Sequence, residues 1–196
     1  MQKDPRPDII ARYNKLERPL LDELAGVGIR VQSVWDLDEF DLEYPAAIPV
    51  LLTHMDKDYS AFSRSGIISA VCKKWARDQV WQTIIKAYET EPNLARYAQP
   101  GEIGSPSSPK SAMANGILEM AVASDMDKLI ELIENPMNGP SRILLTPYFS
   151  RSRQQRAFDT LARLSDDPDL KVEIAHILKR KLRYAASKSG ASDIRH

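Results

Sequence analysis

The chain offers few side chains of the types that do nucleophilic or metal chemistry. Its histidines are His54, His176 and His196, and Cys72 is its single cysteine. The histidines form no HExxH pair, and one cysteine can form neither a CxxC site nor an intrachain disulfide. GxSxG, P-loop and GxGxxG patterns are absent, and residues 101–104 are too short a stretch for a phosphate-binding loop. We therefore expect neither catalysis nor a bound metal or cofactor, although a triad built from distant residues would leave no such pattern.

Basic side chains cluster where helices are expected to end, and this is the main candidate for a functional site. Cations at a helix C-terminus gain about 0.3–1 kcal/mol from the helix dipole, which explains part of the clustering. In stacked helix pairs the second helices line one wall, so the clusters would form a basic stripe. We expect this stripe to bind an acidic protein surface, with dipole pairing and nucleic-acid binding as the alternatives. The candidate residues are Arg142, Arg151, Arg153, Arg156, Lys179, Arg183, Lys73, Lys74 and Arg77.

Residues 93–109 form the second candidate. Ile84 and Leu132 lie 48 residues apart, and removing these 17 residues leaves 31, close to the repeat spacing described below. The segment is therefore interpreted as an insertion in a repeat, and a long loop in a compact array is functional or disordered. Tyr97 and Ile103 are apolar enough to dock on the protein or on a partner.

Composition bounds the class of protein. The 196 residues contain 43% apolar side chains, enough for one continuous core, and 27 basic against 27 acidic groups. Zero net charge argues against general nucleic-acid binding, although residues 1–60 carry −5 and residues 61–196 carry +5. The N-terminus does not resemble a signal peptide, and no apolar run approaches the ~20 residues that span a membrane. We expect a cytoplasmic protein that does not bind membranes.

An acidic stretch near the N-terminus resembles a calcium loop only in composition. It lacks the central glycine and the ligand spacing of an EF-hand. We interpret it as a solvated loop, with a patch for a cationic partner as the alternative. Its acidic residues are Asp36, Asp38, Glu39, Asp41 and Glu43.

A two-helix unit that recurs about four times must position these candidates. Residues 127–136 match residues 159–168 at an offset of 32, and residues 48–55 match residues 81–88 at an offset of 33. A helical repeat with a period in the thirties is typical of an α-solenoid. The first helices are expected at 44–57, 78–90, 125–134 and 155–165, and the second helices at 63 through Trp75, 111–123, 141–153 and 170–184. Pro147 should bend one of them.

The remaining segments complete the expected organisation. Residues 1–43 form an N-terminal helical cap, in which Pro19 should kink or break a helix that begins at Asp8. Residues 44–184 form the repeats, and residues 185–196 form a flexible tail. All three belong to a single compact domain in this prediction.

The repeats resemble the HEAT family of α-solenoids. Pro45 through Leu52 is similar to the first helix of a HEAT repeat, and an acidic residue stands in the turn between the two helices (Asp56 or Asp58, Glu134, and Asp166 or Asp167). A basic residue opens each second helix, namely Arg64, Lys110, Arg142 and Lys171. The chain departs from the family in its long insertion, in Pro147 and in residues 1–43.

The resemblance implies an all-α superhelix of about four hairpins, similar to small bacterial HEAT-like proteins without an assigned activity. HEAT families mostly bind proteins, so we expect a non-catalytic scaffold that binds a partner on its concave face, such as an immunity or adaptor protein. Some HEAT-like proteins are DNA glycosylases that remove alkylated bases, and others attach bilins to phycobiliproteins. A nucleic-acid-binding protein and a phycobilin lyase-like chaperone are therefore the alternatives.

Overall fold

The structure is a computed structural model that describes residues 6–40, 42–93 and 108–190, with side chains described for residues 15–40, 42–93 and 108–183. Helices account for 77% of the residues, and the described ranges contain no strand. The prediction of an all-α fold is confirmed. Contacts divide the chain into two compact units, unit 1 being Met1–Met120 and unit 2 Ala121–His196. The prediction that both belong to a single domain stays a prediction.

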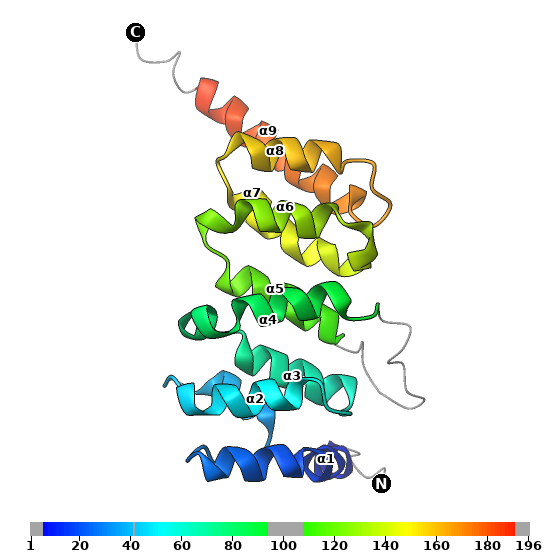
Figure 1. Cartoon of the computed structure of the whole chain (residues 1–196). Helices are drawn as coiled ribbons and strands as arrows, with labels where there is room; N and C mark the ends of the chain where they lie inside the picture. Colours follow the sequence, from blue (N-terminus) through cyan, green and yellow to red (C-terminus); the bar gives the residue numbers. More distant parts are fainter. Residues whose placement is uncertain (1–5, 41, 94–107, 191–196) are drawn as a thin grey trace. The chain divides into compact units, whose positions relative to one another are not determined.

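Unit 1 consists of an N-terminal helix followed by two helix pairs (Figure 1). Its α-helices are α1 (Arg6–Gly26), α2 (Ile48–Met55), α3 (Ala61–Val71), α4 (Arg77–Thr90) and α5 (Pro109–Met120). Short 3₁₀ turns precede or join them: η1 (Val34–Glu39), η2 (Pro45–Ala47) and η3 (Lys74–Ala76). Helix α3 packs on α2, α5 and η1, and α4 packs on α5. Because α3 is covered on three sides, even its polar residues Ser63 and Ser65 are buried.

The N-terminal helix was predicted to kink or break at Pro19. Helix α1 continues through Pro19 as one helix, so there is no break, and the kink stays a prediction. Leu20 and Leu24 follow the proline and are fully buried, because α1 packs on α2. Apolar burial of this kind outweighs the loss of one backbone hydrogen bond at the proline.

Glu17 ties α1 to the rest of unit 1. Its carboxylate is fully buried and accepts hydrogen bonds from Ser63 Oγ at 2.7 Å and from Ser33 Oγ at 3.1 Å. It also accepts one from the backbone N–H of Val34 at 3.0 Å. Three donors compensate for its lost hydration. These bonds hold η1 against α1 and α3, which places Trp35 beside α3.

The second helix of the first pair is shorter than predicted. Helix α3 ends at Val71, with Cys72 as its C-cap, and Lys73 has an extended backbone. Trp75 therefore lies in η3 and is half-buried, with its ring edge-on to Tyr44 at a centroid distance of 5.0 Å. The prediction that the second helix continues through Trp75 is wrong. In the next pair, Ile117 on α5 is fully buried.

Unit 2 contains two further helix pairs. Its elements are η5 (Ala123–Asp125), α6 (Met126–Glu134), η6 (Pro136–Leu145), α7 (Thr146–Arg151), α8 (Gln155–Arg163) and α9 (Lys171–Gly190). Helix α6 packs on η6 and α8, and α9 packs on α7 and α8. Pro147 does not bend a helix. It stands in the first turn of α7, where its missing N–H costs no hydrogen bond.

The segment before α7 is a run of 3₁₀ turns instead of the predicted α-helix. Gly139 interrupts it with a φ of 64°, a backbone conformation that glycine adopts without strain. Helix α9 continues to Gly190, beyond the predicted start of the tail, and residues 191–196 lie outside the described part of the chain. None of the described helices has the length and apolar character that crossing a membrane requires.

Candidate functional site

Arg64, one of the basic residues that resemble the HEAT pattern, is buried at the start of α3. Its Nε donates to the carbonyl of Met55, the last residue of α2, at 3.0 Å. Its two terminal nitrogens bind the two carboxylate oxygens of Glu91, at 2.9 and 3.0 Å. Glu91 caps the end of α4. Arg64 therefore joins the turn of its own helix pair to the turn of the next pair.

Lys110 occupies the equivalent position in α5. Its Nζ donates to the carbonyl of Glu91 at 2.8 Å and lies 5.2 Å from the centroid of the Tyr88 ring. Burial lowers the pKa of Lys110, and the charge of Glu91 opposes that shift. Arg64 and Lys110 thus meet at one residue, which makes this part of unit 1 a structural junction.

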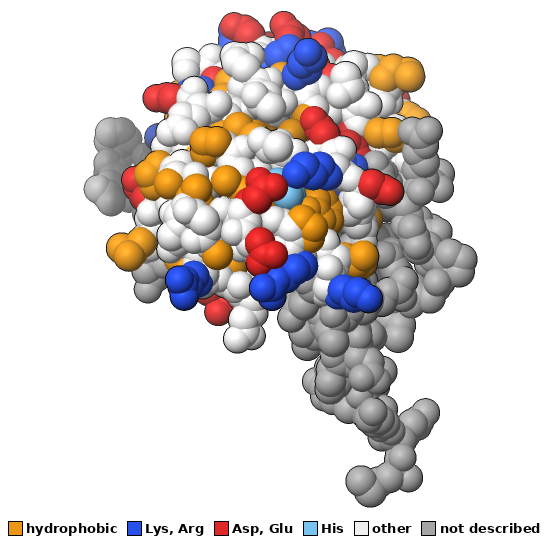
Figure 2. Space-filling model, turned by 60° about the horizontal axis from the view of Figure 1, so that its bottom comes forward, with side chains coloured by type: hydrophobic (Ala, Val, Ile, Leu, Met, Phe, Trp, Pro, Cys, Tyr) orange, Lys and Arg blue, Asp and Glu red, His pale blue; other side chains and the backbone are white. Residues whose placement is uncertain are grey.

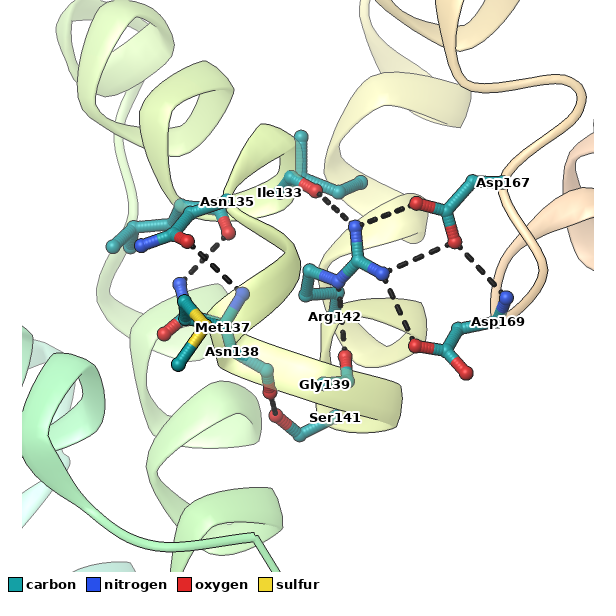
Figure 3. Close-up of polar contacts among 10 residues, drawn as sticks. Ile133, Asn135, Met137, Asn138, Gly139, Ser141, Arg142, Asp167 and Asp169 are labelled. Carbon is teal, nitrogen blue, oxygen red and sulfur yellow. Dashed lines mark hydrogen bonds and ion pairs between the residues drawn. The ribbon is translucent and has the colours of Figure 1, made fainter.

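Arg142 occupies the same position in unit 2 and uses all five of its N–H donors (Figure 3). Nε donates to the carbonyl of Gly139, and Nη1 donates to the carbonyl of Ile133. Nη1 and Nη2 bind the two oxygens of Asp167, and Nη2 also binds Asp169 at 3.1 Å. The side chain is only 1% exposed. The prediction that Arg142 projects into a basic stripe is therefore wrong, because the side chain lies in the interior.

Lys171 departs from this pattern. It begins α9 but is exposed, whereas the other three bases are buried. The sequence showed the recurrence of these bases but not their burial.

Four other residues of the predicted stripe are paired with neighbouring carboxylates. Lys73 lies 2.7 Å from Asp38, Lys74 lies 3.4 Å from Glu119, Arg77 lies 3.4 Å from Asp78, and Arg156 lies 2.9 Å from Asp127. Arg77 also stacks over the Trp81 ring at 4.8 Å. On the side of unit 1 that Figure 2 brings forward, basic and acidic side chains are likewise interspersed. Pairing of this kind neutralises the predicted cations of unit 1.

The remaining cations of the predicted stripe, together with Arg180, lie on α7, just after α7 and on α9 of unit 2. They are exposed, and no ion pair joins them to a carboxylate in the described part of the chain. Hydrogen bonds place the two segments together, since Arg180 Nη2 donates to Ser150 Oγ at 2.7 Å and Lys181 Nζ donates to the carbonyl of Ser152 at 2.9 Å. We call this set the unit-2 basic surface: Arg151, Arg153, Lys179, Arg180 and Arg183.

A pocket of about 480 Å³ lies within this surface. Arg151, Arg180 and Glu173 supply its charged lining, and Pro147 and Ile177 supply apolar lining. Beside it, burial and then the charge of Arg180 lower the pKa of Lys181. Two arginines face one acid here, so the recess favours anionic groups.

Unit 1 contains a second pocket, of about 470 Å³, on α3 and α5. Its lining is mostly small and polar, with one aromatic ring. The lining residues are Trp35, Ser65, Ser69, Cys72, Lys73, Ser111, Ala112, Asn115, Gly116 and Glu119. Burial raises the pKa of the Cys72 thiol to about 12, so this cysteine is not a thiolate nucleophile.

A cluster around His54 was not predicted. His54 is fully buried, and its Nδ1 lies 2.6 Å from Tyr59 Oη. Its Nε2 lies 2.8 Å from Lys57 Nζ and 3.0 Å from Glu23 Oε1. The arrangement has the connectivity of a carboxylate–histidine–hydroxyl relay. The sequence spacing could not predict this cluster, because Glu23 lies on α1 and His54 lies on α2.

The contacts of this cluster nevertheless indicate a structural role. Burial and then the charges of Glu23 and Glu17 raise the pKa of Tyr59, which opposes formation of the phenolate. The hydrogen bond from His54 lowers the pKa of Glu23, so the carboxylate stays ionised. These contacts join α1 to the turn between α2 and α3.

Other predicted candidates have simpler outcomes. In the acidic stretch, Asp36 caps η1 by accepting from the backbone N–H of Ser33, and Asp38 binds Ser69 and Lys73. Within the described residues no group of acidic, histidine and cysteine side chains could hold a metal ion. Tyr97 and Ile103 lie outside the described residues.

Comparison of the chain with protein-family models, with curated proteins and with solved structures finds no match.

Proposed function

We propose that this chain is a non-catalytic protein-binding module whose unit-2 basic surface binds an acidic surface of a partner protein. One observation carries the proposal. Five cations on α7, α9 and the residue pair after α7 are exposed without a carboxylate partner in the described part of the chain. Elsewhere the predicted cations are buried or paired, so this surface is where an external anion would gain most.

The surroundings of the surface favour a protein over a nucleic acid. Glu173 lies in the same recess as Arg151 and Arg180, and it would repel a phosphate backbone that followed the groove. The chain as a whole has no net charge, which weakens non-specific attraction to a polyanion. A folded acidic partner can instead place its carboxylates on the arginines and leave Glu173 at the edge.

We further propose that the helix pairs are HEAT-like repeats. The support is the recurring base at the start of the second helix. Arg64, Lys110 and Arg142 each bind a carbonyl at the end of the preceding helix of their own pair. Arg64 and Arg142 also bind carboxylates of the following pair. Such repetition suits a stacked array that presents surfaces to partners.

The test compares the wild-type chain with the double variant Arg151→Glu, Arg153→Glu. Each is immobilised and exposed to a lysate of the source organism, and the retained proteins are identified by mass spectrometry. A recombinant partner is then used to measure association and dissociation rates at low and at physiological salt. Because rim charges act mainly on the association rate, we expect it to fall several-fold at low salt, with a smaller effect at physiological salt.

The matched control is the double variant Arg30→Glu, Lys86→Glu. It makes the same change in net charge at two exposed positions of unit 1, and it should bind as the wild type does. Equal loss in both variants would mean that net charge alone sets binding. An unchanged association rate of the Arg151→Glu, Arg153→Glu variant would show that the unit-2 basic surface is not the interface. Tight binding of duplex DNA by the wild type, lost in this variant, would indicate a nucleic-acid ligand instead of a protein partner.

A further inference from the structure

The residues that line the unit-1 pocket form pairs with a constant offset in the sequence. Ser65 and Ser111, Ser69 and Asn115, and Lys73 and Glu119 are separated by the same offset of 46 residues, as are Arg64 and Lys110. Successive pairs are four residues apart, which is about one helical turn or 6 Å along the axis. The pocket lining therefore consists of three steps, two along α3 and α5 and a third where Lys73, just after the end of α3, lies beside Glu119 of α5. The first step contains the hydroxyls of Ser65 and Ser111, the second a hydroxyl and an amide, and the third a cation and an anion.

Contacts at both ends show that α3 and α5 run parallel through this region. At one end Arg64 and Lys110 bind the same residue, Glu91. At the other end Lys74 lies 3.4 Å from Glu119. The lining pairs thus face a common groove, which is about 12 Å long because eight residues of α5 separate Ser111 from Glu119.

The two helices approach each other at a glycine. A Cβ added to Gly116 would overlap both Sγ and Cβ of Cys72, far inside van der Waals contact. Only a residue without a side chain lets α5 come this close to α3. The close approach closes the floor of the groove, and small residues above it leave the space open.

An aromatic wall borders the hydroxyl end of the groove. The Trp35 ring lies against α3 at Gly66, where an added Cβ would lie 2.9 Å from Cε2 of the indole. Its other neighbour is the exposed ring of Phe62, at a centroid distance of 5.0 Å. Trp35 Nε1 is buried and has no hydrogen-bond partner within the described part of the chain. This nitrogen lies on the side of the indole that packs against α3, because a Cβ added to Gly66 would lie 3.0 Å from it.

Polar groups at the middle of the groove are available to a ligand. Asn115 is exposed, and its amide makes no hydrogen bond with the described residues. It offers one carbonyl acceptor and two N–H donors. Ser111 Oγ accepts only a long bond of 3.3 Å from Ser108. This part of the lining can both donate and accept.

The charged end is neutral in sum. Lys73 lies 2.7 Å from Asp38, and Glu119 lies 3.4 Å from Lys74. A phosphate group would therefore find no free cation in the groove, and a metal ion would find no cluster of carboxylates. An apolar ligand would leave the hydroxyls and the amide without hydration.

We propose that this groove binds a short, extended, uncharged peptide segment of a partner protein. Peptide backbone alternates N–H donors and C=O acceptors, which suits the Asn115 amide, which can both donate and accept, and the Ser111 hydroxyl, which accepts from Ser108 and can still donate. At about 3.3 Å per residue, a groove of about 12 Å holds about four residues of extended chain. One apolar side chain of the peptide packs against Trp35, and the backbone binds Asn115. The site lies in unit 1, and the proposal is independent of the one made for the unit-2 basic surface.

The experiment selects peptides with the full-length chain. A phage library of random heptapeptides is selected on the wild-type chain, and the recovered sequences are synthesised with blocked ends. Binding is followed by the indole ¹H–¹⁵N signals of Trp35, Trp75 and Trp81, each assigned by a Trp→Phe variant. The Trp35 signal should shift on binding, while the signals of Trp75 and Trp81 should stay, because those residues do not line the groove.

Two variants decide the location. Asn115→Leu should weaken binding of a selected peptide about tenfold, as expected for the loss of hydrogen bonds in a partly buried site. Gln82→Leu, an equivalent change at an exposed position of α4 outside the groove, should leave the affinity unchanged. Recovery of no binding peptide, or equal affinity for Asn115→Leu and the wild type, would overturn the proposal. A shift of the Trp35 signal with cellohexaose or chitohexaose, and not with peptides, would assign the groove to carbohydrate instead.

Discussion

Arg142 and Asp167 lie 25 residues apart and are joined by two parallel hydrogen bonds, from Nη1 to Oδ2 at 2.8 Å and from Nη2 to Oδ1 at 3.1 Å. The planar guanidinium matches the carboxylate in a way that a lysine cannot. The pair ties η6 to the turn between α8 and α9. It converts a basic residue that looked like a surface charge into part of the interior of unit 2.

We predict that Arg142→Met destabilises the protein by about 3–5 kcal/mol, because it leaves the carboxylates of Asp167 and Asp169 without their cation and two carbonyl groups without this donor. Chemical denaturation followed by circular dichroism measures the change. Arg163→Met removes an exposed ion pair with Glu134 and should cost at most about 1 kcal/mol. Equal effects of the two substitutions would contradict the structural role of Arg142.

The same pair predicts how stability depends on pH. Burial alone raises the pKa of Asp167, but hydrogen bonds from Arg142 and from the backbone N–H of Asp169, together with the charge of Arg142, lower it below its usual 3.8. A carboxyl group with a lowered pKa in the folded state stabilises the protein above its unfolded pKa, and the contribution is lost as the pH falls through the folded value.

We therefore predict that unfolding free energy falls as the pH decreases below about 4, and that Asp167→Asn makes this fall shallower. Denaturation at a series of pH values measures both slopes. Asp166→Asn, at the exposed neighbouring position, should keep the slope of the wild type. A slope that Asp167→Asn leaves unchanged would assign the acid sensitivity to other carboxyl groups, such as Glu23.

Local patterns in the sequence predicted most of the helices. The expected helix at 78–90 corresponds to α4, and the expected first helices in unit 2 correspond to α6 and α8 within a few residues. These segments have regular apolar spacing, which local periodicity detects directly. The second helices were less accurate. Helix α3 stops at Val71 although the apolar spacing continues to Trp75, and no glycine or proline marks the end.

Local patterns could not separate surface charges from interior ones. Arg142 and Arg151 look alike in the sequence, yet Arg142 is buried against two aspartates that follow α8, and Arg151 is exposed. The difference depends on which loops meet after folding. For the same reason, local patterns could not predict the contact between Glu23 and His54 or the facing pairs of the unit-1 groove. Both depend on how the helices pack.

The close approach of α3 and α5 predicts that Gly116→Ala destabilises unit 1 by about 1–3 kcal/mol, the usual range for overpacking a core. Gly26→Ala is the matched control, because a Cβ there meets no atom within 4 Å and alanine suits a helix at least as well as glycine. The second substitution Cys72→Gly removes both clashing atoms and should recover part of the loss. A neutral Gly116→Ala would mean that the helices separate easily.

We predict that most of the segment between α4 and α5 can be deleted without loss of the fold. The repeat spacing alone suggested removing residues 93–109, but Ser108 Oγ accepts from the backbone N–H of Ser111 at 3.1 Å and Pro109 begins α5. Complete removal would delete the cap and cost about 0.5–2 kcal/mol. Replacing only residues 94–107 with a short glycine–serine turn retains both residues. The ends can be joined, because Lys110 Nζ reaches the carbonyl of Glu91 at 2.8 Å.

We expect the shorter deletion to keep the helix content of the wild type and an unfolding free energy within about 1 kcal/mol of it, since loop-closure entropy changes slowly with length. The deletion of residues 93–109 should be less stable by the value of the lost cap. Circular dichroism and urea denaturation of both variants provide the comparison. Loss of helical structure in the 94–107 variant would mean that the segment contributes to the core of unit 1.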